Sequence, residues 1–452
     1  MTSPLPVLLP GSLTEVPATA GARWLAPDGV PRYAEPWFRA GPPAGKYPVL
    51  VTRYADVAAI LAAPDGTWLR HVPESQVPRP RHPVLDASWL LDGPEHRTLW
   101  QQLTVVYRGS GPAARQFTRD LTAVLAAEMM TQPPPWNLAT VIDEVSCRVM
   151  IEHTLAAPVL LPHLVRLREL TRAMAPPPPD DEADVMACFR PPERQPDLEV
   201  ILGEVARAAA VLPAGLARHL AQLARAGHLT GEQLISQLAM LIASAESQAA
   251  AASGAIAMLM AGGLLGDAQR AAGDPEGMRQ LTAGGLRRAI SFPFLMLSPA
   301  GPQQTGGRDI EAGEPVLVSL AAANADPAAY SPGTPPLPHL SFGRGPRRCQ
   351  GAVQAEQFMA DVITGLAGLP ATVRLGHDGQ VRREVTGVSW AIAEFPAVPE
   401  LRELGTGDAR RRGSDPAFAR IPALPAAGSS RRSGRGRHRV RTSDLCLVVA
   451  AL

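Results

Sequence analysis

One cysteine lies within a glycine-punctuated loop in the last third of the chain. The loop reads Phe342-Gly343-Arg344-Gly345-Pro346-Arg347-Arg348-Cys349-Gln350-Gly351, and a helix-like run begins directly after it. Because glycine has no Cβ, the loop backbone can approach the sulfur closely. The N-terminus of the following helix carries partial positive charge, which favours the thiolate of Cys349 over the thiol. The loop predicts a metal-ligating thiolate, and the alternative is a surface turn with an incidental cysteine.

This pattern also suits a flat macrocycle whose iron is held by the sulfur. A thiolate ligand increases the electron density on a haem iron and promotes O–O cleavage. The loop resembles the haem-binding signature of the cytochrome P450 family, in which Phe, Gly, a basic residue, Cys and Gly recur at this spacing. The resemblance implies haem b (iron protoporphyrin IX) as cofactor and Cys349 as the axial iron ligand. It also implies that Phe342, Gly343 and Gly351 contact the haem and that Arg347 holds a haem propionate.

Other segments resemble the same family in the same order along the chain. Residues 47–57 resemble its first strand and second helix, residues 92–97 the start of its third helix, and residues 316–327 the late strand before the haem loop. His96 matches a propionate-binding histidine of the family; an ordinary helix-start histidine is the alternative. The similarity extends from about Tyr33 to Leu375. It implies a mainly α fold, with a large helical domain and a small β-rich subdomain.

An acid directly precedes an alcohol at Glu246 and Ser247, within an alanine-rich helical pattern. This segment resembles the oxygen-activating motif of the family, in which a small residue and Gly precede an acid and Thr. A hydroxyl and an ordered water can relay protons from a carboxylate to a reacting group, so Glu246 and Ser247 are the predicted catalytic residues. Small side chains at residues 243–245 leave room for a haem. The alternative is an ordinary buried helix in which these polar residues interrupt the apolar surface at one place.

The sequence departs from the family pattern on the haem side. The family places a Glu three residues before an Arg on the helix ahead of the loop, but that position is Gly284 or Gly285, depending on whether Arg287 or Arg288 is aligned. A second arginine is missing from residues 326–339. Loss of the whole charged cluster can be nearly neutral, whereas a lone buried arginine would be costly.

The sequence also has fewer arginines than the family at positions that bind the haem propionates. Trp100 stands where an arginine is common, and residues 295–299 lack another. Arg97 or Arg108 could substitute for them.

Mostly helical elements are expected to position these residues. Helical patterns dominate from Asp56 to Leu286, with breaks at Gly and Pro clusters. Thr230 is the predicted N-cap of a long helix, with Gln233 as its capping-box partner. Residues 249–266 carry no charge over a length that could span a bilayer, but their Ala, Ser and Gly content favours a helix through a protein core.

The chain divides into three parts. Residues 1–32 are proline-rich, residues 33–400 are predicted to form one haem domain, and residues 401–452 form an Arg/Gly/Ser-rich tail that is predicted to be disordered. The tail has a net charge of +7 and the rest of the chain −6, a distribution that does not favour nucleic-acid binding. By the resemblance, the proline-rich stretch at residues 176–194 covers the substrate pocket.

Four scattered cysteines encode no local zinc or iron–sulfur site and fit a reduced, cytoplasmic setting. Residues 1–12 lack a basic region and are interrupted by prolines, so no secretory signal or membrane anchor is predicted there. We expect a monomer with no nucleic-acid or membrane partner.

The leading hypothesis is a monooxygenase that uses O2 to hydroxylate, epoxidise or couple a small hydrophobic substrate, in specialised metabolism by family analogy. By the same analogy, apolar residues around Trp89, Phe292 and Phe294 favour a hydrophobic, medium-sized molecule. No dinucleotide fingerprint follows a strand, so the electrons are expected from a ferredoxin and an NAD(P)H-dependent ferredoxin reductase, docked near Arg344 and Arg348. The alternative is a catalytically impaired homologue that binds or activates another biosynthetic enzyme, a hypothesis motivated by the missing Glu and Arg.

Overall fold

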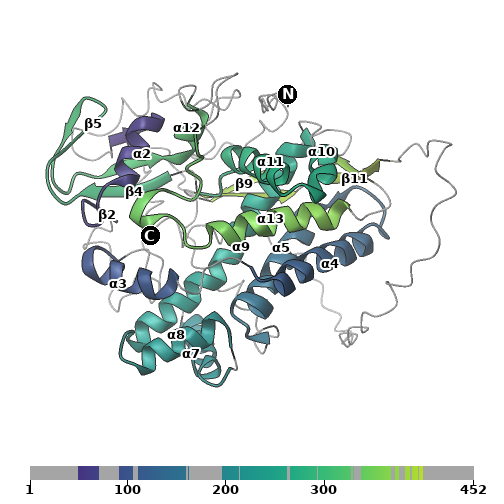
Figure 1. The fold of residues 1–452 in the computed structure, drawn as a ribbon, viewed down its shortest axis with the longest axis horizontal. Helices are drawn as coiled ribbons and strands as arrows, with labels where there is room; N and C mark the ends of the chain where they lie inside the picture. Colours follow the sequence, from purple (N-terminus) through teal and green to yellow (C-terminus); the bar gives the residue numbers. More distant parts are fainter. Residues whose placement is uncertain are drawn as a thin grey trace, which may run out of the picture.

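A computed structural model gives the fold of the chain (Figure 1). It describes residues 49–70, 91–104, 110–158, 161, 196–212, 214–261, 265–292, 294–326, 329, 337–367, 372–375, 382–386, 389–394 and 396–400. The segments predicted as a proline-rich N-terminus, a cover over the pocket and a basic tail lie outside these residues, as do Trp89 and Arg108. Within them the chain is mainly helical with small sheets, as the sequence predicted.

The helices in chain order are α2 (Tyr54–Ala62), α3 (Gly93–Thr104), α4 (Pro112–Met129), α5 (Leu138–Val149), α7 (Pro196–Ala209), α8 (Gly215–Arg225), α9 (Gly231–Ala261), α10 (Leu265–Arg270), α11 (Pro275–Arg288), α12 (Leu320–Ala325) and α13 (Ala352–Ala367). Short helical turns are η3 (Met150–Thr154), η6 (Ala271–Gly273) and η7 (Gly345–Arg347). The strands are β1 (Val49–Val51), β2 (Trp68–Arg70), β3 (Trp136–Asn137), β4 (Phe294–Pro299), β5 (Gln303–Thr305), β6 (Arg308–Ile310), β7 (Val316–Ser319), β8 (Thr372–Leu375), β9 (Arg382–Thr386), β10 (Ser389–Glu394) and β11 (Pro396–Glu400).

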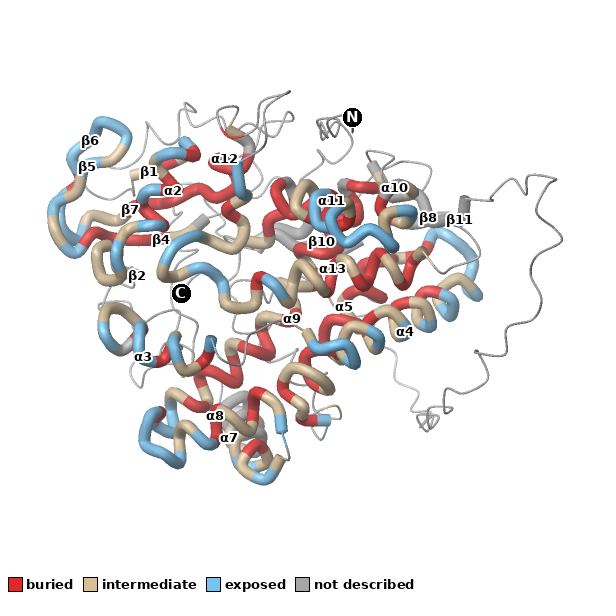
Figure 2. The backbone as a smooth tube through the Cα atoms, viewed as in Figure 1, coloured by how far each residue is buried: buried red, intermediate tan, exposed pale blue. Residues whose placement is uncertain are grey.

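The long helix α9 runs through the core of the helical region (Figure 2). Its start has the predicted capping box: the Thr230 N–H donates to Gln233 Oε1 at 2.9 Å, and the Gln233 N–H donates to Thr230 Oγ1 at 3.1 Å. Downstream residues such as Ala255 and Ile256 are fully buried against α5, α11 and α13. The prediction of a core helix for residues 249–266 is therefore confirmed as far as Ala261; residues 262–264 lie outside the described part of the chain, and a separate helix, α10, begins at Leu265. Among the described residues, no helix has the length and apolar character needed to cross a membrane.

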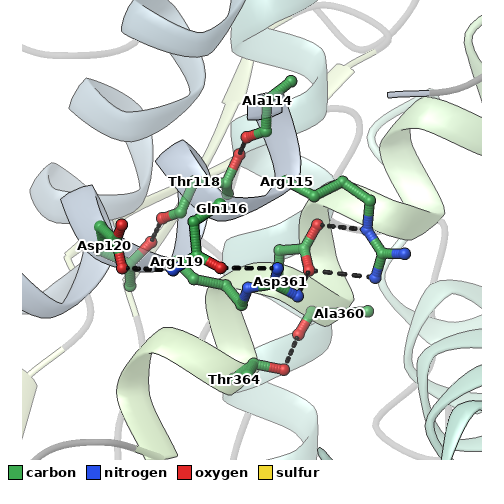
Figure 3. Close-up of polar contacts among 10 residues, drawn as sticks. Ala114, Arg115, Gln116, Thr118, Arg119, Asp120, Ala360, Asp361 and Thr364 are labelled. Carbon is green, nitrogen blue, oxygen red and sulfur yellow. Dashed lines mark hydrogen bonds and ion pairs between the residues drawn. The ribbon is translucent and has the colours of Figure 1, made fainter. Parts of the chain in front are cut away.

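Helices α4 and α13 lie side by side and are joined by an ion-pair cluster (Figure 3). Asp361 on α13 is almost fully buried and accepts from Arg115 Nε at 3.0 Å and Nη2 at 3.2 Å, and from Arg119 Nη1 at 3.1 Å. The helices approach closely beside it, since a Cβ at Gly365 would lie 2.6 Å from the Arg119 carbonyl oxygen and 2.8 Å from Thr122 Cβ. This contact fixes the helix that begins just after Cys349.

The main sheet has the strand order β1-β7-β4-β2. β1 pairs parallel with β7, while β4 pairs antiparallel with both β7 and β2. Apolar side chains of this sheet and of α2 form a second core that includes Val316, Val318 and Ile60. The register sets Arg70, the last residue of edge strand β2, opposite Leu297.

Three smaller groups of strands complete the described sheets. β11 lies between β3 and β8, β9 pairs with β10, and β5 pairs with β6. None of the described side chains of β3, β5 and β6 lines the cavity described below.

Candidate active site

The cysteine loop is closed by backbone hydrogen bonds. The Cys349 N–H donates to the Phe342 carbonyl at 2.8 Å, and the Gly343 N–H donates to the Leu340 carbonyl at 2.8 Å. Helix α13 begins at Ala352, directly after the loop, as the sequence predicted. These bonds hold the cysteine at the N-terminal end of a long helix.

Two glycines of the loop have a backbone conformation that other residues rarely adopt. Gly343 has φ +68° and Gly345 has φ +69°. Gly345 also lies against the C-terminal end of α2, where a Cβ would come within 2.5 Å of the Leu61 carbonyl oxygen and 2.8 Å of Ala62 Cα. Glycine at position 345 therefore allows both the turn and the close contact with α2.

Asn324, fully buried in α12, connects the loop to the helical domain. Its Oδ1 accepts from the Leu340 N–H at 2.7 Å, and its Nδ2 donates to Ser341 Oγ at 2.9 Å. The Ser341 hydroxyl in turn donates to the Leu286 carbonyl at 2.8 Å. The loop that carries the cysteine is thus tied to both α11 and α12.

A buried arginine lies at the end of α11, where either Arg287 or Arg288 could match the arginine of the family pattern. Arg287 is 7% exposed and donates to the carbonyls of Asn324, at 3.3 Å, and Leu337. The residue three positions earlier is Gly284. Neighbouring Gly285 lies where α11 crosses α9, and a Cβ there would lie 2.9 Å from the Cβ of Ala255.

A cavity opens between the loop and α9, with walls from several segments of the chain. The loop and α13 contribute one side and α9 another, and residues of α2, α3, η3, α12, the main sheet and the segment before β4 line the rest. The lining residues are Leu61, Arg70, Trp100, Met150, Met240, Leu241, Ser244, Ser247, Gln248, Ala251, Ser291, Phe292, Leu295, Leu320, Ser341, Phe342, Gly343, Arg347, Cys349, Gln350, Gly351, Gln354 and Ala355. Six of the predicted site residues therefore surround one space: Phe342, Gly343, Arg347, Cys349, Gly351 and Ser247.

The Cys349 thiol is exposed to this cavity. Burial raises the pKa of Cys349 above its usual value, while the backbone N–H groups of Gly351 and Ala352 and the charge of Arg348 act in the opposite direction. The predicted effect of the helix start is therefore present, but desolvation outweighs it. A cation beside the sulfur would tip the balance to the thiolate.

The α9 wall of the cavity is lined by Ser244, Ser247 and Gln248. Ser247 Oγ donates to the Ser244 carbonyl at 3.0 Å. Glu246 is half-buried and does not line the cavity. Gln248 Nε2 donates to Ser146 Oγ at 3.3 Å, and this hydroxyl donates to the Ala245 carbonyl at 2.6 Å. Ser146 therefore connects α5 to the helix turn that carries Glu246.

At another edge of the cavity, Arg347 is bound by two aspartates. Its Nε donates to Asp65 Oδ1 at 3.1 Å, and its Nη2 donates to the Leu91 carbonyl at 2.6 Å and to Asp92 Oδ1. Asp65 also contacts the imidazole of His96 through Oδ2, at 3.0 Å from Nδ1. Arg347, Asp65 and His96 are therefore one connected ion cluster.

His96 is buried behind this cluster and does not line the cavity. Its ring lies 5.3 Å from that of Trp100, which does. Burial lowers the pKa of His96, and the charge of Arg347 lowers it further, against the opposing effect of Asp65. Its Nε2 is buried with no hydrogen-bond partner among the described residues.

Arg70 is the second cation at this edge. It lines the cavity at the end of β2, and its backbone N–H donates to Asp92 Oδ2 at 3.3 Å. Burial lowers the pKa of Arg70 to about 10, with a further lowering by Arg347 and an opposing effect of Asp92. The sequence offered no signal for Arg70 or Asp65, since neither is near the cysteine loop in the chain.

No family model and no curated protein matches the chain. Solved structures do match it. P450 EryK, as a mutant in complex with erythromycin B, is 18% identical with a TM-score of 0.60, over 81% of this chain and 92% of that one. The chain has the cytochrome P450 fold. Two further solved structures match the chain. HinD with NMFT and NO is 22% identical with a TM-score of 0.66, over 84% of this chain and 98% of that one. The mycinamicin VIII C21 methyl hydroxylase MycCI from Micromonospora griseorubida is 20% identical with a TM-score of 0.63, over 80% of this chain and 96% of that one.

The residues around the cavity fit the haem that a P450 fold implies. Cys349 presents its sulfur to the cavity, and burial disfavours a thiolate there without a cation. Gly351 lies beside the sulfur, since a Cβ there would lie 3.9 Å from Sγ, at an ordinary contact distance. At the edge of the cavity formed by Arg347 and Arg70, the structure differs from the expectation that Arg347 holds a haem propionate. Arg347 lines the cavity but is already paired with Asp65 and Asp92.

Proposed function

We propose that the chain is a haem-thiolate monooxygenase that oxidises a small hydrophobic organic molecule of specialised metabolism. The observation that carries this proposal is that Cys349 and Ser247, about a hundred residues apart in sequence, line the same cavity within a P450 fold. A haem bound through its iron to Cys349 supplies the activation of O2 and the transfer of one oxygen atom to the substrate.

Cys349, Phe342, Gly343 and Gly351 would hold the haem on the loop side. The closed loop keeps the sulfur in place, because the Cys349 N–H and the Phe342 carbonyl are joined at 2.8 Å. The N–H groups of Gly351 and Ala352 favour the thiolate. A haem iron bound there would supply the cation that favours the thiolate of Cys349.

Ser247 would move protons on the opposite side. Its hydroxyl donates to the Ser244 carbonyl, so both lone pairs of Oγ stay open to accept from a water or an acid. Rotation of the hydroxyl then directs its proton into the cavity. Glu246, adjacent in the chain and half-buried, is the proposed proton source, reached through an ordered water because it does not line the cavity.

Apolar side chains would hold the substrate and exclude water. The lining residues of this kind are Met150, Met240, Leu241, Phe292, Leu295 and Leu320. They suit a hydrophobic molecule, in line with the ligands named for EryK, erythromycin B, and for MycCI, mycinamicin VIII. Burial of such a ligand is driven by the removal of apolar surface from water.

The two electrons of each turnover would come from a ferredoxin and its NAD(P)H-dependent reductase. Arg344 and Arg348 are exposed on the loop that carries Cys349 and offer positive charge to an acidic partner. One oxygen atom of O2 then enters the substrate, and the other leaves as water with two protons, so the balance needs no further reductant.

A second function is favoured by one observation. Because Asp65 and Asp92 already pair with Arg347, the chain could keep the fold yet bind haem weakly and act as a partner of another biosynthetic enzyme.

Optical spectroscopy on the purified full chain tests the proposal. Reduced protein treated with carbon monoxide is expected to show the strongly red-shifted Soret band of thiolate ligation. Cys349→Ala is expected to lose that band, and Cys147→Ala, which replaces a buried cysteine that does not itself line the cavity, to keep it. A colourless protein after supplementation with hemin would refute the proposal and favour the partner function.

A further inference from the structure

The arginines at the cavity edge are already neutralised by carboxylates of the protein itself. Arg347 makes ion pairs with Asp65 and Asp92, at 3.1 Å for the pair with Asp65. Arg70 lies next to Asp92: the charge of Asp92 acts on its guanidinium, and Asp92 Oδ2 accepts from the Arg70 backbone N–H at 3.3 Å. The two arginines and two aspartates have no net charge.

Other described residues do not add a cation to this edge. His96 lies behind Asp65 and outside the cavity lining, and its ring contacts Trp100. Arg97 is exposed and does not line the cavity. Among the described residues, the edge therefore has two cations, Arg347 paired with Asp65 and Asp92, and Arg70 beside Asp92.

A haem brings two propionate carboxylates, which must lie at some edge of its pocket. If they lie beside Arg70 and Arg347, four carboxylates share two arginines. Carboxylates that share the same arginines in a partly buried site repel each other substantially. Each propionate must then compete with Asp65 or Asp92 for a guanidinium that it would otherwise bind bidentately.

We propose that Asp65 and Asp92 are specificity residues that compete with the haem propionates for Arg70 and Arg347, so that the pocket retains an iron porphyrin without edge charges at least as well as one with two carboxylates. This inference rests on the proposed function, because it concerns how the same cavity holds its cofactor. Asp92 is the better residue to change, since its side chain is 27% exposed, whereas Asp65 is 3% exposed and also anchors His96.

The test measures the release of two cofactors from the full-length protein. Wild type, Asp92→Asn and a control, Asp309→Asn, are loaded either with hemin or with hemin dimethyl ester, in which both propionates are uncharged. Asp309 is exposed on β6 and bonds to Gln304, so its replacement removes one negative charge far from the cavity lining. Release is followed at the Soret band after addition of excess apomyoglobin as acceptor.

We expect wild type to release hemin at least as fast as the dimethyl ester. Asp92→Asn should slow the release of hemin about tenfold, equivalent to about 1.4 kcal/mol, and leave the release of the ester within about twofold. Asp309→Asn should change neither rate. Asp65→Asn is the second variant and should act in the same direction as Asp92→Asn on hemin.

Three outcomes would overturn the inference. The first is a wild type that retains hemin far longer than the ester. The second is an Asp92→Asn variant that releases hemin as fast as wild type. The third is an Asp92→Asn variant that releases both cofactors equally more slowly, which indicates a general effect on the fold. In each case a thiolate-type carbon monoxide band in the same samples leaves the proposed function intact. If no variant acquires a Soret band, the proposed function itself is refuted and the inference falls with it.

Discussion

Replacement of Gly345 by alanine separates two reasons for a glycine in the cysteine loop. Gly343 and Gly345 share nearly the same φ, +68° and +69°. At Gly345 a Cβ would lie 2.5 Å from the Leu61 carbonyl oxygen, whereas at Gly343 the nearest atom is the Arg347 carbonyl oxygen at 3.6 Å. Gly343→Ala is therefore a matched control that carries the backbone strain without the clash.

The two costs can be estimated from the structure. A left-handed backbone conformation costs an L-residue about 1–2 kcal/mol, and both variants should lose this much. The clash at Gly345 involves backbone atoms of α2, which cannot move aside as a flexible side chain would, and overpacking of this kind costs about 1–3 kcal/mol more. We expect Gly345→Ala to lower the free energy of unfolding by about 2–5 kcal/mol and Gly343→Ala by about 1–2 kcal/mol.

Urea unfolding monitored by tryptophan fluorescence measures both losses from the midpoint and the slope of the transition. The same samples, reduced under carbon monoxide, report whether Cys349 keeps its position, and the red-shifted band should weaken more in Gly345→Ala. Equal destabilisation by the two substitutions would refute the role of the α2 contact. A loss below about 1 kcal/mol in both would refute the backbone argument as well.

Three further predictions follow from other parts of the structure. Asp361→Asn should lower the free energy of unfolding by about 1–3 kcal/mol, because it weakens charge-assisted bonds to a buried carboxylate, whereas Glu276→Gln should have little effect, because that ion pair is fully exposed. Burial, with the charges of Arg287 and Arg348, lowers the pKa of His339 to about 4, so the unfolded chain binds a proton more readily. The stability that neutral His339 contributes is therefore complete above pH 6.5 and is lost as the pH falls toward 4. Between pH 7 and pH 5 the free energy of unfolding should fall by about 2 kcal/mol from this group. In urea titrations, His339→Gln should make the free energy of unfolding less dependent on pH over this range. Ser247→Ala should leave haem bound while less of the consumed oxygen appears as product, measured by an oxygen electrode against product yield.

For each of these three predictions, one outcome would contradict the reasoning. Equal destabilisation by Asp361→Asn and Glu276→Gln would remove the special role of the buried carboxylate. An unchanged slope between pH 7 and pH 5 in His339→Gln would show that other groups carry the acid sensitivity. Unchanged coupling in Ser247→Ala would mean that the proton relay uses other groups, such as the Ser244 hydroxyl on the same wall.

The sequence by itself determined the local features of this protein. Thr230 and Gln233 specify the start of α9, because a capping box satisfies backbone N–H groups within a single turn. The glycines around Cys349 and the helix after it likewise predicted a loop whose shape depends on a few adjacent residues. The mainly α architecture also followed from the hydrophobic periodicity and the family resemblance.

Only the tertiary structure decided which distant residues meet. Asp65, Arg70 and Asp92 join Arg347 because β2 and the start of α3 pack beside the loop, and no local pattern encodes a contact across more than two hundred residues. The same holds for burial at Cys349: the helix start favours a thiolate locally, but the surrounding protein raises the thiol pKa, because desolvation depends on atoms from the whole fold. Short segments of the sequence therefore determine which residues can do chemistry, whereas the folded chain determines their ion pairs and pKa values.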